Sequence, residues 1–236
     1  SDNTNKKIPK VLDEIEDDAV MFIMNALYFN GDWSYQFDKS LTDERAFYPD
    51  GGGTVNVSTM NGEVGSKVVY SNDYKAIEMP YGRTNFTMVV IVPQGTLNSF
   101  YTSFTHQSWS QLTAELDGKA EFGKTIVFMP KFKFEYEKYL NDQLKSMGMV
   151  DAFNPFKANL SGISNQSLYV DFVKQNTFVE VDEEGTEAAA VTTIGINLST
   201  SIQPQPNEFV VDKSFIFAIR ERTTNTLLFI GKVVNP

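Results

Sequence analysis

The side chains that most often carry catalysis are scarce in this sequence. It contains one histidine, His106, and no cysteine. A Ser-His-Asp hydrolase would need His106 as its base, yet the sequence has no G-x-S-x-G motif. A zinc ion would find only carboxylates, because thiolate and paired imidazole ligands are missing. We therefore expect no enzyme activity, no catalytic residue, no metal and no cofactor, with His106 at the surface.

Two groups of neighbouring acids remain, Asp17–Asp18 and the run Asp182-Glu183-Glu184. Paired carboxylates can share an acid–base reaction, but consecutive residues of a strand point to opposite faces. These acids are therefore poorly placed to act on one substrate. We interpret them as solvated ends of secondary-structure elements.

The acidic run leads into an unusual segment, GTEAAAVTTIGINLSTS, from Gly185 to Ser201, whose one charge is Glu187. As a strand, the segment would have one face made of Thr186, Ala188, Ala190, Thr192, Ile194, Ile196 and Leu198. An exposed helix is the alternative for the alanines, but the β-branched run 191–194 opposes it. Both tendencies suit a segment that changes its conformation.

Apolar runs predict many strands elsewhere in the chain. They cover residues 19–29, 54–60, 75–81, 85–93 and 124–137, and two more flank the polar turn ERTTNT near the C-terminus. The run 19–29 is apolar on both faces, which predicts a strand buried on both sides. Helical spacing predicts short helices within residues 8–18, 97–116 and 139–149. Without repeats or linkers, we predict a single strand-rich α/β domain.

Composition limits the partners. The formal charge is −10, and no basic cluster offsets it, so we expect neither nucleic acid nor an anionic membrane surface as a partner. No apolar run approaches the roughly 18 residues of a transmembrane helix. The start, SDNTNKKIPK, is not a signal peptide, so any export signal would lie outside this sequence.

The run E-E-G-T-E-A-A-A, residues 183–190, resembles the hinge of the serpin family of serine-protease inhibitors. The stretch from Asn25 to Trp33 is similar to the family's N-A-x-Y-F-x-G-x-W strand, and Met129-Pro-Lys-Phe132 to its P-K-F strand. Further matches are Leu144, Gly148, Met149, Ala152, Phe153, Leu160–Ile163, Phe209–Asp212, Phe215–Phe217, Ile219, Arg220 and Phe229–Pro236. Their order and spacing agree with the family along essentially the whole chain.

The resemblance implies a mixed α/β fold with several sheets, the serpin fold. Residues 1–236 would be the C-terminal portion of the serpin domain, with the reactive-centre loop at about 184–208. A complete serpin is far longer, so several N-terminal helices and some strands would be missing or supplied by another chain.

Two positions depart from the family pattern. Ser214 stands where proline is usual, and Gln175 stands where a histidine often faces the strand asparagine, here Asn25. We expect the Gln175 amide to hydrogen-bond Asn25, without the charge change that a histidine would allow.

The resemblance also implies an inhibitory mechanism. A protease cleaves the exposed loop, and the freed N-terminal arm then inserts into the main sheet as a strand and carries the acyl-enzyme with it. The hinge would comprise Glu183, Glu184, Gly185, Thr186, Glu187, Ala188, Ala189 and Ala190. The region where the sheet opens would contain Asn25, Trp33, Lys131 and Gln175, with Glu183 paired to Lys131. Small inward side chains favour an inhibitor over the alternative, a non-inhibitory carrier or chaperone-like serpin.

The usual family spacing places the reactive bond between Ser199 and Thr200, with Leu198–Ser199 next, inside a bracket that ends at Gln203. No lysine or arginine lies between Gly185 and Val211, so a trypsin-like pocket has no residue to bind. The expected partner is a serine (or cysteine) protease of elastase-, chymotrypsin- or subtilisin-like specificity, held as a covalent acyl-enzyme. We expect a secreted, cell-surface or periplasmic protein, of bacterial type.

Overall fold

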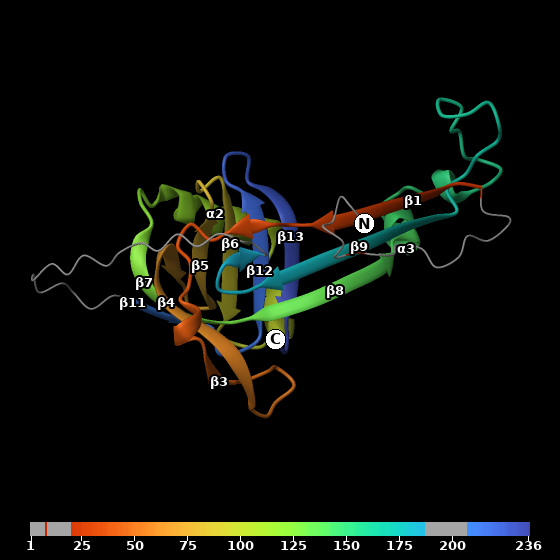
Figure 1. Ribbon diagram of the computed structural model, residues 1–236. Helices are drawn as coiled ribbons and strands as arrows, with labels where there is room; N and C mark the ends of the chain where they lie inside the picture. The colour runs from red at the N-terminus through yellow and green to blue at the C-terminus, as the bar shows by residue number, and fades with distance from the viewer. Residues whose placement is uncertain (1–7, 9–19, 187–206) are drawn as a thin grey trace, which may run out of the picture. The chain divides into compact units, whose positions relative to one another are not determined.

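The computed structural model of the chain describes residue 8, residues 20–186 and residues 207–236 (Figure 1). The predicted helix within 8–18 and the segment 187–201 therefore lie outside the described residues, apart from Ile8. Contacts within the chain divide it into two compact units. One unit comprises Ser1–Phe29 and Lys133–Val179, and the other comprises Asn30–Phe132 and Glu180–Pro236.

The first unit is built on a three-stranded sheet with the order β1-β9-β8. Its strands are β1 (Phe22–Tyr28), β9 (Phe172–Val181) and β8 (Phe132–Tyr139). β1 and β9 are parallel, and all seven residues of β1 pair in unbroken register, from Phe22 with Phe172 to Tyr28 with Phe178. The chain between β8 and β9 forms the short helix α3 (Asn141–Ser146) and the 3-10 turn η3 (Asp151–Phe153).

The strand predicted over 19–29 exists as β1, but the prediction that both of its faces are buried is wrong for this chain. Ile23 and Met24, which point to opposite faces, are 41% and 45% exposed. An apolar strand reads as buried because apolar side chains are normally covered, yet the sequence does not say which segment covers them. Among the described residues, no segment buries either side chain fully.

The second unit is built on an eight-stranded sheet. Seven of its strands follow the order β11-β7-β4-β5-β6-β12-β13, and the eighth, β3, pairs with β4. Its strands are β3 (Asp43–Phe47), β4 (Val55–Tyr70), β5 (Tyr74–Tyr81), β6 (Phe86–Pro93), β7 (Gly123–Pro130), β11 (Asn207–Val210), β12 (Phe215–Glu221) and β13 (Thr226–Val233). The predicted run 124–137 is divided between β7 and β8 at Lys131.

The long strand β4 holds this sheet together, since it pairs with three strands in succession. Its first residues pair with β3, Thr59–Ser66 pair with β7, and Lys67–Tyr70 pair with β5. The sequence predicted only the first part of β4, because Asn61, Gly62 and Gly65 interrupt the apolar alternation.

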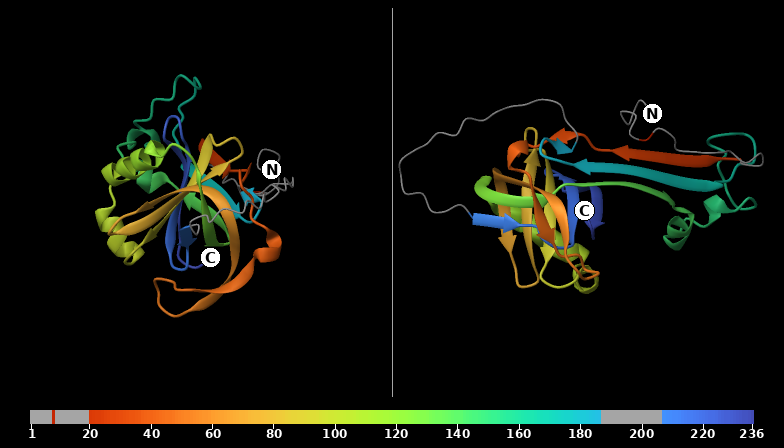
Figure 2. Two further views of the ribbon diagram at one scale, coloured as in Figure 1. Left: turned by 90° about the vertical axis from the view of Figure 1, so that its left-hand side faces the viewer. Right: turned by 60° about the horizontal axis from the view of Figure 1, so that its bottom comes forward.

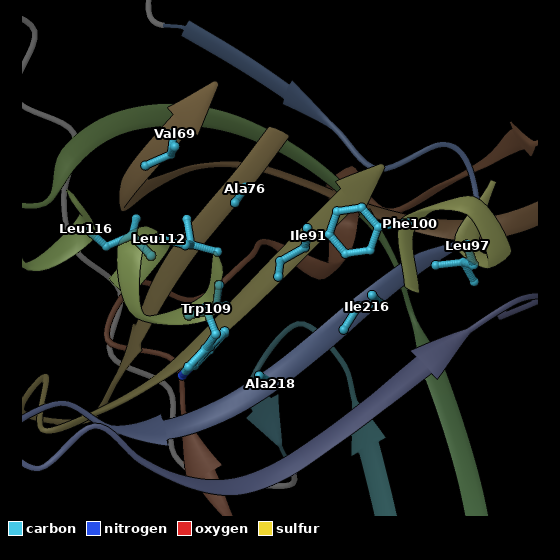
Figure 3. Close-up of a cluster of buried hydrophobic side chains, with 11 residues drawn as sticks. Val69, Ala76, Ile91, Leu97, Phe100, Trp109, Leu112, Leu116, Ile216 and Ala218 are labelled. Atoms are coloured by element: carbon cyan, nitrogen blue, oxygen red, sulfur yellow. The ribbon is translucent and has the colours of Figure 1, made fainter. Parts of the chain in front are cut away.

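Two helices cover one face of this sheet, α1 (Leu97–Ser103) and α2 (His106–Gly118) (Figure 2). Thr96 caps α1, and a reciprocal capping box between Thr105 and Ser108 begins α2. The helices bury their apolar faces against the strands in one cluster (Figure 3). It contains Val69, Ala76, Val89, Ile91, Leu97, Phe100, Trp109, Leu112, Leu116, Ile216 and Ala218. His106 is exposed, as predicted.

A fully buried ion pair lies beside this cluster. Arg220 of β12 and Glu78 of β5 are both 0% exposed, and the Arg220 Nη2 donates to Glu78 Oε1 at 2.6 Å. Arg220 also donates to both carboxylate oxygens of Asp117, and Thr87 donates to Glu78. These bonds offset part of the cost of removing both charges from water, although Glu78 Oε2 is buried without a hydrogen-bond partner among the described residues. The pair therefore locks β5, β12 and the end of α2 into one arrangement.

We predict that Arg220→Met lowers the free energy of unfolding by about 3–5 kcal/mol, because it leaves the Glu78 charge buried without its partner. Urea unfolding followed by circular dichroism measures this loss. The control is Lys124→Met, which breaks the exposed pair between Lys124 and Glu63 and costs about 0–1 kcal/mol. Equal losses for the two variants would contradict a special role for the buried pair.

Candidate functional site

The hinge residues form a short strand instead of a free connection. β10 (Gly185–Thr186) pairs antiparallel with β2 (Gly31–Asp32), with Gly185 opposite Asp32 and Thr186 opposite Gly31. Here the hinge site means residues 182–186 and the side chains that contact them. All of its residues belong to the second compact unit.

Gly185 is the residue that permits this pairing. Its φ is +150°, which L side chains rarely adopt, and a Cβ there would overlap the carbonyl oxygen of Gly31 and lie 2.7 Å from the Cα of Asp32. Both obstacles are backbone atoms, so a side chain could not be relieved by a rotamer change. The hinge glycine is thus required by close backbone approach in the uncleaved chain.

Residues of the segment 33–37 hold the hinge backbone. The backbone N–H groups of Trp33 and Phe37 donate to the carbonyls of Glu184 and Glu183, at 2.9 and 3.0 Å. The indole Nε1–H of Trp33 donates to the carbonyl of Asp182 at 2.9 Å. Trp33 therefore binds two carbonyls of the hinge site.

Glu183 forms the ion pair with Lys131 that the sequence predicts, with Nζ and Oε2 3.1 Å apart. Its side chain is only 3% exposed, whereas that of Lys131 is 39% exposed. Thr42 donates its hydroxyl to the other oxygen, Oε1, at 2.6 Å. Burial raises the pKa of Glu183, but the bonds from Thr42, the backbone and Lys131 outweigh it and hold the pKa below its usual value of 4.5.

The interpretation of the run 182–184 as solvated acids is therefore wrong for Glu183. Each of the three acids has its own hydrogen-bond partners. Asp182 accepts from the backbone N–H of Glu184 at 2.9 Å, and Glu184 pairs with the exposed Lys39. Sequence reasoning missed Thr42 and Lys39, because no motif marks a threonine or lysine about 140 residues away as a partner.

Thr186 lies at the buried end of the hinge and is 1% exposed. Its Oγ1 lies 2.8 Å from the hydroxyl of Tyr81, the last residue of β5. The Tyr81 ring stacks on Trp33, with centroids 4.3 Å apart and an interplanar angle of 10°. Burial raises the pKa of Tyr81 above the usual tyrosine value, so its hydroxyl keeps its proton well into the alkaline range. No sequence motif marks Tyr81 as part of this site.

Asn25 and Gln175 occupy directly opposite positions of the parallel pair β1–β9 in the first unit. The expected hydrogen bond between them does not form in the described part of the chain. Gln175 Nε2 donates instead to Thr177 Oγ1 on its own strand, at 3.3 Å. Residues two apart on one strand share a face, which makes Thr177 the nearer acceptor.

The remaining predicted residues lie outside the described part of the chain: Glu187, Ala188, Ala189, Ala190, Leu198, Ser199, Thr200 and Gln203. Within the described residues, no group of three or more His, Cys, Asp or Glu is placed to hold a metal ion. None of the described helices has the length and apolar character needed to span a bilayer. What the hinge site offers is a set of noncovalent bonds that fix where the following segment begins.

We predict that Gly185→Ala breaks the pairing of β10 with β2, because a strained φ in a non-glycine residue costs about 1–3 kcal/mol even without the overlap. Amide hydrogen exchange at Trp33 and Phe37 reports the loss, since both donate to hinge carbonyls. We expect exchange at least about tenfold faster.

The matched control is Gly51→Ala, where a Cβ meets no atom within 4 Å and φ is not strained. Unchanged exchange in Gly185→Ala would show that the described hinge geometry is incorrect.

Comparisons with known proteins agree over the whole chain. The family model described as serpin (serine protease inhibitor) matches residues 1–236. An uncharacterized serpin-like protein of Methanosarcina mazei is 40% identical over 239 residues, which cover 100% of this chain and 54% of that protein. The chain thus spans about half the length of that relative.

Solved structures give the same result. The native state of the thermophilic serpin tengpin has a TM-score of 0.83 and 31% identity, covering 100% of this chain and 60% of its own. Human thyroxine-binding globulin complexed with thyroxine has a TM-score of 0.84 and 25% identity, covering 99% and 61%. The mixed α/β fold with several sheets is confirmed, and this chain belongs to the serpin family.

Proposed function

We propose that the protein containing this chain inhibits a serine protease by inserting its cleaved loop into a sheet. The observation that carries the proposal is the hinge site, where Thr186 is strand-paired and buried and its preceding residues are held by Trp33, Thr42 and Lys131. To insert into a sheet, a segment whose first residues are already paired as a strand needs only to extend that pairing. An ordinary surface connection would not bury its first residue.

In this proposal, the incoming strand would enter the sheet of the first unit between β1 and β9. β1 and β9 are parallel neighbours in direct register, which leaves no strand between them before cleavage. An arm that folds back from the end of β9 runs antiparallel to β9, and therefore to β1 as well. Insertion would replace one parallel ladder by two antiparallel ladders, which bond slightly better for each residue. The gain in backbone hydrogen bonds drives the change.

The side chains of the arm suit this path. Thr186, Ala188, Ala190 and Thr192 would face inward, and all four are small. Glu187, the one charge before the reactive bond, would face outward. A charge on the inward face would cost several kcal/mol unless it found a partner, so its absence supports an inhibitor.

The covalent step uses the reactive bond of the loop. The hydroxyl oxygen of the protease serine bonds to the carbonyl carbon of Ser199, the peptide bond to Thr200 breaks, and the new Thr200 amine takes the proton. Leu198–Ser199 is the second candidate bond. Insertion of the arm then moves the acyl-enzyme before water can release it, which traps the protease.

The loop sequence narrows the target. Between Gly185 and Val211 there is no lysine or arginine, which supports a target with a small or apolar primary pocket, namely an elastase-, chymotrypsin- or subtilisin-like protease. A cysteine protease of similar specificity is a further candidate. Such targets act outside the cytoplasm in many settings, and a secreted, cell-surface or periplasmic location fits them.

The second candidate function is a non-inhibitory binding or chaperone-like role. Human thyroxine-binding globulin, whose solved structure is a complex with thyroxine, shares this fold at 25% identity. Family membership alone therefore does not decide between inhibition and binding. The small inward residues of the hinge favour inhibition.

The test is a protease panel on the full-length protein. We predict a complex with elastase, chymotrypsin or subtilisin that survives boiling in SDS, and none with trypsin at this loop. Mass spectrometry of the released peptide identifies the cleaved bond, expected at Ser199–Thr200. A trypsin complex at this loop, with none for the other three, would contradict the proposed specificity.

Thr186→Arg is the matched variant for the mechanism. A buried, unpaired arginine would stall insertion, so we predict that the variant is cleaved at the same bond but no longer retains the protease. Complex formation at the wild-type level in this variant would exclude strand insertion through Thr186. Loop cleavage of the wild type without any stable complex would favour the non-inhibitory function.

A further inference from the structure

Two buried hydroxyl groups meet at the end of the hinge. Tyr81 Oη and Thr186 Oγ1 are 2.8 Å apart, and both residues are nearly inaccessible, at 3% and 1% exposed. We call this pair the hydroxyl latch. Among the described residues, Tyr81 supplies the hydrogen-bond partner of the Thr186 hydroxyl.

The tyrosine side of the latch is fixed by the surrounding backbone. Tyr81 forms a β-bridge with Trp33, on which its ring stacks. Ser34 N–H donates to the carbonyl of Pro80, and Gly82 N–H donates to that of Asp32. The end of β5 is thus joined to the segment 32–34, which fixes the backbone of Tyr81, while stacking on Trp33 orients its ring.

The threonine side is held only at the hinge. β10 has two residues, so its pairing with β2 contributes few ladder bonds. A buried hydroxyl that lacks a partner is unfavourable, so losing the Tyr81 bond would disfavour the buried position of Thr186. The latch therefore adds, at the Thr186 end, to the bonds from Trp33 and Phe37 that hold the hinge backbone.

We propose that Tyr81 is a positioning residue for loop insertion: its hydroxyl holds Thr186 in the sheet before cleavage. This inference rests on the proposed inhibitory function. After acylation, insertion competes with hydrolysis of the acyl-enzyme. With Thr186 already in place, insertion begins by extending an existing pair. Without the latch, Thr186 must first enter the sheet before insertion can start. A larger fraction of the acyl-enzyme is then hydrolysed, which releases active protease and cleaved inhibitor.

The first experiment measures docking without any protease. In the full-length protein, Tyr81→Phe and Thr186→Val each remove one hydroxyl and keep nearly the same volume. We expect amide hydrogen exchange in residues 182–186 to become about tenfold faster in either variant, with no further increase in the double variant. Thr186→Ser, which keeps the hydroxyl, retains most of the protection.

The second experiment measures how the acyl-enzyme divides between loop insertion, which traps the protease, and hydrolysis, which releases it. The number of inhibitor molecules consumed for each protease trapped should rise severalfold in Tyr81→Phe and Thr186→Val, while the rate of loop cleavage stays unchanged. A merely destabilised fold would not separate these two quantities. The control is Tyr74→Phe at the other end of β5, where the tyrosine hydroxyl bonds to no atom within the described chain.

The outcomes separate the two claims. Unchanged exchange in both latch variants overturns the inference, whatever the inhibition assay gives. If amide exchange becomes faster but the number of inhibitor molecules consumed for each protease trapped stays the same, the positioning role of Tyr81 is overturned. If the wild type traps no protease in the panel, the proposed function fails instead, and exchange alone then decides whether the latch holds Thr186.

Discussion

The pairing of Gly185 and Thr186 with Gly31 and Asp32 is the constraint on which the rest of the hinge site depends. It brings two backbones so close that only glycine fits at position 185. It directs Thr186 toward the end of β5 and Glu183 toward Thr42 and Lys131. Each of these contacts is modest by itself, since single hydrogen bonds contribute about 0.5–1.5 kcal/mol. Together they hold residues 182–186 in one place.

The second unit supplies a rigid support for this arrangement. The helices α1 and α2 bury a continuous apolar cluster against the sheet, and the Arg220–Glu78 pair fixes β5 relative to β12. Tyr81 ends β5, so the latch rests on a strand that is anchored along its length. The first unit differs in kind, because β1 and β9 form one parallel ladder and β1 is largely exposed. In the proposed mechanism, the β1–β9 ladder is the one that the cleaved loop would enter.

The sequence predicted much of this fold, and its errors have physical causes. Alternation and turn residues located most strands, and the motifs placed Trp33, Lys131 and Glu183 near the loop. Several failures concern contacts between residues far apart in sequence. The composition of the run 182–184 indicates solvated acids, because local pattern does not reveal Thr42 as a partner of Glu183, and nothing in the sequence marks Tyr81. The Gln175 amide bonded to Thr177 instead of Asn25, because facing positions do not determine which acceptor is nearer.

Thermal unfolding before and after a single cut in the loop tests the central claim most directly. If the hinge holds an arm ready to insert, cleavage between Leu198 and Gln203 in the full-length protein adds a strand to the sheet of β1 and β9. The melting temperature then rises sharply, and Thr186→Arg abolishes the rise. A nick that leaves the melting temperature unchanged, or lowers it as in an ordinary surface loop, would contradict the account.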